Sequence, residues 1–314
     1  MESIYDVRGT AHQVVEQASQ VTICDPALET LAELVRDSDL ERLTSASAFD
    51  TETHFFDGGP QTVQYLLVVD ALNFCFWPAE DLEYEHLARG VKAAAMNNPG
   101  SLTASSLSQY TGADVQRLFD WQQPVPLLEE RARLLREVGR GLQQYFNGQA
   151  ANLVLAAHKS AASLITMLTT YFPGFQDHCI YRGRQIHLLK RAQIFVADVW
   201  GAFQGQSYGR FDDISELTMF ADYRVPAALR EFGVLEYAPS LAQRIDDRAE
   251  LPAGSEEECE IRACTIVAVE KLRQALASET RKPNSIHLDW WLWEHGEQHR
   301  KDHRPHHRTL TIYY

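Results

Sequence analysis

Residues 188–203 restrict how this chain can fold more than any other segment, because the helix that they predict is apolar on several sides. A helix of this kind is stable only when other elements cover it, so we expect it to be buried. One face carries an apolar residue at almost every turn, and further apolar residues extend onto neighbouring faces: Leu189, Ala192, Ile194, Val196, Ala197, Val199, Trp200 and Phe203.

Lys190 and Arg191 lie in the first turn of this predicted helix. The helix macrodipole disfavours cations at that end by a few tenths of a kcal/mol or more. Cations placed against this preference indicate an anion nearby, and free backbone N–H groups at a helix start can hold a phosphate. A lysine that extends from the helix end into water explains the position equally well.

Residues 214–233 carry a helical apolar pattern that is interrupted by Pro226. Proline disfavours helical backbone at the preceding residue and suits the first turn of a new helix. We therefore predict two short helices that meet at a bend, with Asp222, Tyr223 and Arg224 in the bend.

Asp222 follows an apolar run and lies too far ahead of Pro226 to be expected as the cap of the second helix. We expect its carboxylate to be partly desolvated and close to Arg224, conditions that tune catalytic acids and bases. An aspartate at a helix end, paired with an arginine, is the simpler structural alternative.

Two further segments place polar side chains among apolar ones. Asp70 and Asn73 lie in the apolar run 61–77, which fits either a helix or a strand, and Asp289 lies beside tryptophans in a helix capped by Asn284 or Ser285. Burying such groups without partners costs about 1–3 kcal/mol each. They either satisfy backbone groups at a helix end or face a polar ligand.

Most of the remaining chain reads as amphipathic helices joined by polar loops. Residues 180–187 alternate around a glycine and predict a β-hairpin. The tail 309–314 predicts a short strand whose final tyrosines tuck into the body of the protein.

The formal net charge of −14 disfavours a large nucleic-acid partner, because no basic patch offsets it. Phosphate-binding glycine loops and serine hydrolase motifs are missing from the sequence. Five scattered cysteines without a CxxC pair are typical of reduced thiols. No apolar run has membrane-spanning length and no signal peptide is recognisable, so we expect a cytoplasmic protein without membrane contact.

Histidines cluster near the C-terminus, and His295 and His299 have the i, i+4 spacing of zinc-binding helices. Glu297 is misplaced for the H-E-x-x-H motif, and the neighbouring residues are charged. We therefore predict an exposed polar face here and no metal site.

The aspartates, the aromatic residues and a cation together suit the cleavage of a nucleotide's glycosidic bond. Aromatic rings stack a base, a cation holds the phosphate, and a carboxylate acts at the sugar. The same residues also occur in ordinary protein cores.

Five segments resemble the queuosine salvage family, whose members are queuosine 5'-phosphate N-glycosylases/hydrolases: 70–77 (DALNFCFW), 190–200 (KRAQIFVADVW), 217–226 (LTMFADYRVP), 284–293 (NSIHLDWWLW) and the terminal IYY at 312–314. The resemblance runs in order from about residue 20 to the end. It implies one mainly α domain over 1–314 with minor β hairpins, related to helix-hairpin-helix DNA glycosylases. It also implies release of queuine from queuosine 5'-monophosphate without a metal or redox cofactor. The sequence does not determine the oligomeric state, and we favour a monomer.

The resemblance also implies roles for individual residues. Asp222 matches the catalytic aspartate, as nucleophile or general base, and Lys190 matches a position on the phosphate side of the ribose. Other matched pocket positions are Asp70, Asn73, Phe74, Tyr223, Arg224 and Asp289, while His54 matches only loosely. A non-catalytic module for a modified nucleotide or tRNA, and a nucleic-acid base glycosylase acting on a flipped base, are the alternatives.

Overall fold

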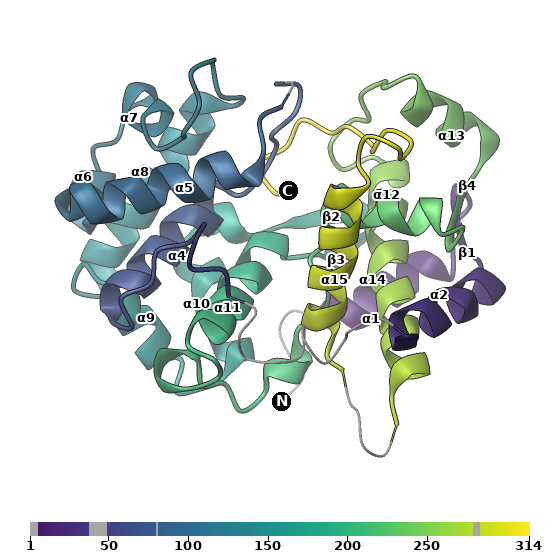
Figure 1. Ribbon diagram of the computed structural model, residues 1–314, viewed down its shortest axis with the longest axis horizontal. Helices are drawn as coiled ribbons and strands as arrows, with labels where there is room; N and C mark the ends of the chain where they lie inside the picture. The colour runs from purple at the N-terminus through teal and green to yellow at the C-terminus, as the bar shows by residue number, and fades with distance from the viewer. Residues whose placement is uncertain (1–5, 38–48, 80, 279–282) are drawn as a thin grey trace.

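The computed structural model describes residues 6–37, 49–79, 81–278 and 283–314 and is mainly α-helical (Figure 1), as predicted. The specific relation to helix-hairpin-helix glycosylases stays a prediction. The α-helices are α1 (Val7–Val15), α2 (Asp25–Asp37), α4 (Pro60–Leu72), α5 (Tyr84–Asn97), α6 (Ala104–Leu107), α7 (Gly112–Gln116), α8 (Leu128–Tyr145), α9 (Ala150–Ala156), α10 (Ala161–Tyr171), α11 (Lys190–Ala202), α12 (Arg224–Glu231), α13 (Pro239–Asp246), α14 (Glu256–Leu276) and α15 (Ser285–Gln298).

Short elements connect these helices. Strand β1 pairs antiparallel with β4, far away in the sequence, whereas β2 and β3 form the hairpin predicted at 180–187. The elements are β1 (Val21–Ile23), β2 (His178–Tyr181), β3 (Arg184–His187), β4 (Leu235–Tyr237) and the 3₁₀ turns η1 (Pro99–Leu102), η2 (Pro173–Phe175), η3 (Ser207–Gly209) and η4 (Ile214–Glu216).

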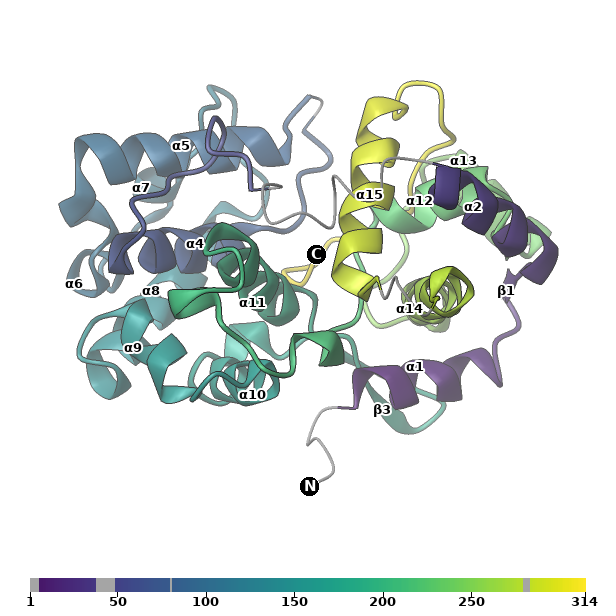
Figure 2. The same ribbon diagram turned by 60° about the horizontal axis from the view of Figure 1, so that its bottom comes forward.

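Figures 1 and 2 show two groups of helices, with the C-terminus of the chain between them. One group contains α4 to α11, and the other contains α1, α2 and α12 to α15. A single hydrophobic cluster includes Val68 of α4, Val196 of α11 and Val267 of α14, so apolar packing continues from one group into the other.

Helix α11 is buried as predicted and packs against α4 and α10. The ambiguous run 61–77 is helical only as far as Leu72, and nearly every residue of α4 is buried. Length decides between helix and strand. The thirteen residues of α4, ten of them buried, can satisfy their own backbone as a helix, and α4 has helices α5, α8, α9 and α11 around it.

The predicted first helix of the bend at 214–233 is wrong. Only the turn η4 forms, and the chain then runs extended to α12, where Pro226 occupies the first turn. Backbone groups of the extended segment find partners elsewhere: Thr218 N donates to Gln193 Oε1 at 2.9 Å, and Phe220 N donates to Asp289 Oδ1 at 2.8 Å. These tertiary hydrogen bonds replace the helical ones.

The C-terminal tail does tuck into the protein, but it is not a strand. Tyr314 is buried, its carbonyl accepts a hydrogen bond from Cys75 N at 2.9 Å, and its ring lies 4.1 Å from the Arg262 guanidinium. An isolated bridge between Glu250 and Arg308 is the nearest β pairing. The tail is therefore held by scattered contacts to several elements.

Helix α5 passes close to the backbone of residues 118–120 at Gly90. A Cβ at Gly90 would lie 2.2 Å from Leu118 O and 2.7 Å from Asp120 N. We expect Gly90→Ala to lower the free energy of unfolding by about 1–3 kcal/mol, because backbone must move to admit the methyl group. Urea unfolding measures this change.

Gly100→Ala is the matched control, because the nearest atom to its new Cβ is Asn98 Oδ1 at 3.6 Å. Gly100→Ala should change the free energy of unfolding by no more than about 0.5 kcal/mol. Equal effects of the two substitutions would contradict the close approach at Gly90.

Candidate active site

A cavity of about 930 Å³ opens between the two helix groups. This volume lies in the range of sites that enclose small organic ligands. Its wall combines aromatic rings with charged groups from distant parts of the chain: His54, Asn73, Phe74, Phe76, Trp77, Tyr84, Lys190, Ile194, Asp198, Phe220, Asp222, Tyr223, Arg224, Asp289, Trp290, Trp293, Glu297, Arg300, His306, Arg308 and Tyr314 are among the lining residues.

Three buried cations surround the C-terminal end of α4. Lys190 Nζ donates to the carbonyl of the C-cap residue Asn73 at 2.9 Å, Arg191 donates to Ala71 O at 2.9 Å, and Arg131 donates to Leu72 O. The last carbonyls of a helix lack intrahelical partners and carry partial negative charge. This explains why cations occupy the first turn of α11: they bind the end of a different helix.

Lys190 does not extend into bulk water, because its side chain is buried and forms part of the cavity wall. Burial lowers the pKa of Lys190 to about 8, although Asp222 and Asp70 oppose the shift. The lysine therefore stays cationic at neutral pH next to two carboxyl groups.

The anion expected at the start of α11 belongs to the protein itself. Asp177 accepts a hydrogen bond from Lys190 N at 2.9 Å through Oδ2 and an ion pair from Arg262 at 2.6 Å. The predicted phosphate site on free backbone N–H groups is therefore wrong at Lys190, whose N–H group is already used.

Asp222 lies at the start of α12 and lines the cavity. Its Oδ1 accepts hydrogen bonds from Arg224 N at 3.0 Å and Val225 N at 2.9 Å, so Asp222 does cap this helix. The prediction that Asp222 lies too far away to cap α12 is wrong, because the helix begins two residues before Pro226.

Burial raises the pKa of Asp222, while Lys190 and the two backbone N–H groups act in the opposite direction. Among the described residues, no group donates a hydrogen bond to Oδ2. The carboxylate is thus oriented by the helix start through one oxygen, with its second oxygen available to a molecule in the cavity.

Arg224 does not form the predicted ion pair with Asp222. Its Nε donates to Glu297 at 2.6 Å, which links α12 to α15. Tyr223 stacks on His306 with ring centroids 4.4 Å apart. Both residues line the cavity, but their side chains contact its wall, and only the backbone N of Arg224 bonds to the aspartate.

Asp289 is buried on α15, and its Oδ1 accepts the hydrogen bond from Phe220 N. Burial and the nearby Asp222 carboxylate raise the pKa of Asp289 well above its ordinary value. Both effects favour the protonated form of Asp289, whereas Lys190 favours the ionised form of the neighbouring Asp222.

Asp70 is fully buried and does not reach the cavity, unlike the other predicted pocket residues. Its carboxyl group lies beside Asp198, and burial together with that neighbour raises the pKa of Asp70 well above its usual range. Two adjacent carboxyl groups in a low dielectric hold a proton between them at neutral pH.

Asp198 lines the cavity and was missed in the sequence, although a signal for it was present. Lys190, Ile194 and Asp198 are spaced by four residues on α11, and all three line the cavity. A carboxylate in a helix that is otherwise apolar on several sides indicates the face that meets the site.

Burial raises the pKa of Asp198 to about 7 from an ordinary value of 3.8. Between these pH values the folded state keeps a proton that the unfolded chain has lost, so the stability due to Asp198 decreases as the pH rises through this window. Between pH 5 and pH 8, the free energy of unfolding of Asp198→Asn should therefore rise by at least about 1 kcal/mol relative to that of the unsubstituted protein.

Urea unfolding of both proteins at the two pH values measures this gain. Asp247→Asn serves as the control, because Asp247 is exposed. Its free energy of unfolding should differ from that of the unsubstituted protein by the same amount at both pH values. A pH-independent difference for Asp198→Asn would contradict the predicted proton uptake.

His54 lines the cavity from the loop before α4. Its Nδ1 lies 3.1 Å from Tyr65 Oη, which itself donates to Ala88 O at 3.1 Å, so Nδ1 carries the proton and donates. Burial lowers the pKa of His54 to about 4. A neutral imidazole therefore faces the cavity.

The fold and the site define a mainly helical protein with a cavity for a small polar ligand, in which carboxyl groups, a lysine and aromatic rings converge. The family model described as queuosine salvage protein matches residues 53–314. The chain belongs to this family.

Relatives support the assignment over nearly the whole length. Each of the following is named queuosine 5'-phosphate N-glycosylase/hydrolase. A protein of Dictyostelium discoideum is 48% identical over 81% of this chain and 78% of its own length. A protein of Sphaerobacter thermophilus is 42% identical over 97% and 96%, and one of Bos taurus is 32% identical over 100% of both chains.

Proposed function

We propose that this chain hydrolyses the N-glycosidic bond of queuosine 5'-monophosphate and releases queuine and ribose 5-phosphate. The observation that carries the proposal is the position of Asp222, oriented by the start of α12 and lining a cavity whose wall is rich in aromatic rings. The names of the relatives supply the substrate.

The chemistry of the substrate suits this arrangement. Queuine is a 7-deazaguanine, so its leaving group has no N7 to protonate, and more of the barrier must be lowered at the sugar. Asp222 acts on the anomeric carbon as it gains positive charge, either by attack or by taking the proton of a water molecule. The base leaves with the bonding electron pair and takes up a proton.

Lys190 and the backbone N–H groups at the helix start favour the ionised form of Asp222, against the effect of burial, which raises its pKa. Preorganised charge of this kind costs no reorganisation during the reaction. Asp289 lies close by, and its raised pKa suits a carboxyl group that donates a proton to the departing base.

Prolonged incubation with the mononucleotide, followed by chromatography, tests the proposal. We expect free queuine and ribose 5-phosphate in amounts that exceed the enzyme concentration. Recovery of intact mononucleotide would instead indicate a binding module, and release only from queuosine-containing tRNA would indicate a nucleic-acid glycosylase.

Lys190 is proposed to lie on the phosphate side of the bound ribose. Removal of the 5'-phosphate from the substrate should then lower kcat/KM of the unsubstituted enzyme much more than that of Lys190→Ala, because the variant has already lost the contact. Equal losses in the two enzymes would contradict this contact, and kinetics with the nucleoside and the nucleotide measure it.

The proposed working form is a cytoplasmic monomer that binds no nucleic acid stably. The net charge of −14 repels polyphosphates, which supports the absence of a stable nucleic-acid complex. None of the helices in the described ranges has the length and apolarity needed to cross a bilayer.

A further inference from the structure

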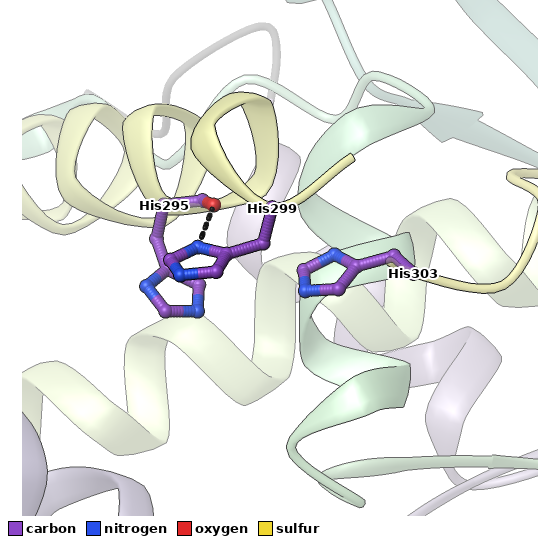
Figure 3. A group of neighbouring side chains, drawn as sticks. All are labelled: His295, His299 and His303. Carbon is purple, nitrogen blue, oxygen red and sulfur yellow. Dashed lines mark hydrogen bonds between the residues drawn. The ribbon is translucent and has the colours of Figure 1, made fainter. Parts of the chain in front are cut away.

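Three histidines converge at the C-terminal end of α15, outside the wall of the cavity. Ring nitrogens of His295, His299 and His303 lie within 4.8 Å of one another (Figure 3). The sequence predicted an exposed polar face here, but only His299 is exposed, and the other two imidazoles are partly buried.

His295 is held in place by aromatic neighbours. Its ring stacks on Trp291 with centroids 5.4 Å apart and packs against Phe232 at 4.8 Å. An imidazole fixed in this way gives up little conformational entropy when it binds an ion. It therefore provides a preorganised first ligand.

His299 has a defined tautomer. Its Nδ1 lies 2.9 Å from His295 O, and because a carbonyl only accepts, Nδ1 must carry the proton (Figure 3). Nε2 is then left with a free lone pair. Metal-binding histidines generally donate their second ring N–H group to a carbonyl or a carboxylate in this manner.

His303 is anchored from both sides by its backbone. His303 N donates to His299 O at 3.1 Å, and the next residue, Arg304, is held by Glu231 through its backbone N at 2.8 Å and its Nε at 2.9 Å. The turn after α15 thus returns the third imidazole to the other two.

The charges around this cluster do not prevent a cation from binding. Metals bind the neutral form of an imidazole, so three neutral rings would add no positive charge to the site. Glu231 contributes negative charge beside His303, while Arg224 contributes the opposite sign and is itself paired with Glu297.

We propose that His295, His299 and His303 bind one borderline first-row transition-metal ion, of which Zn²⁺ is the best match. Three imidazoles suit Zn²⁺, and a water molecule can complete a tetrahedral site on the exposed side of His299. Zn–N bonds of about 2.0–2.1 Å place ligand nitrogens about 3.4 Å apart, so the nitrogens approach by up to about 1.4 Å on binding. The His299 ring, which stacks on His295, also turns so that both lone pairs point at the ion.

The bound ion would join the last turn of α15 to the segment that returns to the cavity with His306 and Arg308. The site is distinct from the carboxylates of the proposed reaction. Its test measures metal binding and not base release, so it does not depend on the proposed function.

The experiment uses the full chain without an affinity tag, freed of metal by a chelator and titrated with Zn²⁺ by calorimetry and with Co²⁺ by visible absorption. We expect one Zn²⁺ per chain, a Co²⁺ d–d band that saturates at one equivalent, and a higher Tm with Zn²⁺. His299→Ala and His303→Ala should each weaken Zn²⁺ binding by at least about 100-fold.

His12→Ala is the matched control, because His12 is exposed on α1 and contributes nothing to the cluster. It should bind Zn²⁺ as the unsubstituted chain does. Absence of stoichiometric binding in the unsubstituted chain, or unchanged affinity in both His299→Ala and His303→Ala, would overturn the proposal. Circular dichroism verifies that each variant is folded.

Discussion

Asp222→Asn is expected to lower kcat for base release by more than about 100-fold, and by more still if the carboxylate attacks the sugar directly. The amide keeps the size of the side chain and an oxygen for Arg224 N and Val225 N, so α12 retains its cap. It removes the negative charge that stabilises the developing positive charge on the sugar. Single-turnover assays with queuosine 5'-monophosphate measure the rate.

Asp247→Asn is the control for this variant, since Asp247 is an exposed aspartate at the end of α13. It should retain the rate of the unsubstituted enzyme. Asp222→Asn should keep the circular dichroism spectrum and bind substrate, which separates lost chemistry from lost folding. Near-normal turnover by this variant would rule out the proposed role of Asp222.

Arg262→Met is expected to cause the largest loss of stability, about 3–5 kcal/mol. Arg262 and Asp177 are both almost fully buried and form two hydrogen bonds of 2.9 and 2.6 Å. Without the arginine, the Asp177 carboxylate stays buried without its charge partner, although it still caps α11. Urea unfolding measures the free energy.

Arg262 also connects this ion pair to the candidate site, because its Nε donates to Ala221 O at 2.9 Å, directly before Asp222. We therefore expect the folded fraction of Arg262→Met to release base more slowly. Lys271→Met is the control on the same helix, because it removes a solvent-exposed ion pair with Asp25. It should lower the free energy of unfolding by at most about 1 kcal/mol. Similar losses in the two variants would contradict the importance of burial.

Local patterns predicted those elements whose stability comes from their own residues. Helix α11, the β2–β3 hairpin and the Asn284 cap of α15 were all predicted correctly. In each case periodicity or a side chain within the element determines the structure.

The bend at Asp222 could not be predicted because its hydrogen-bond partners are remote. Thr218 and Phe220 bond to Gln193 and Asp289, which are 25 and 69 residues away in the sequence. Apolar spacing cannot distinguish an extended segment with such partners from a helix, since both bury the same side chains.

In the candidate site too, local sequence features were predictable and long-range contacts were not. Asp222, Lys190 and Asp289 were recognised because charged residues in apolar runs are costly unless they have partners. Their partners were not recognised: Arg224 binds Glu297, Lys190 binds Asn73 O, and Asp70 lies behind Asp198, outside the cavity.

The sequence by itself determined the mainly helical class, the family, and the unusual position of Asp70, Asn73 and Asp289 among apolar residues, because these depend on composition, on periodicity and on motifs read along the chain. Only the tertiary structure decided which charge meets which: the three cations at the end of α4, the Asp70–Asp198 pair and the histidine cluster after α15. The energy of a buried charge depends on groups within a few ångströms, and folding brings those groups together from distant parts of the chain.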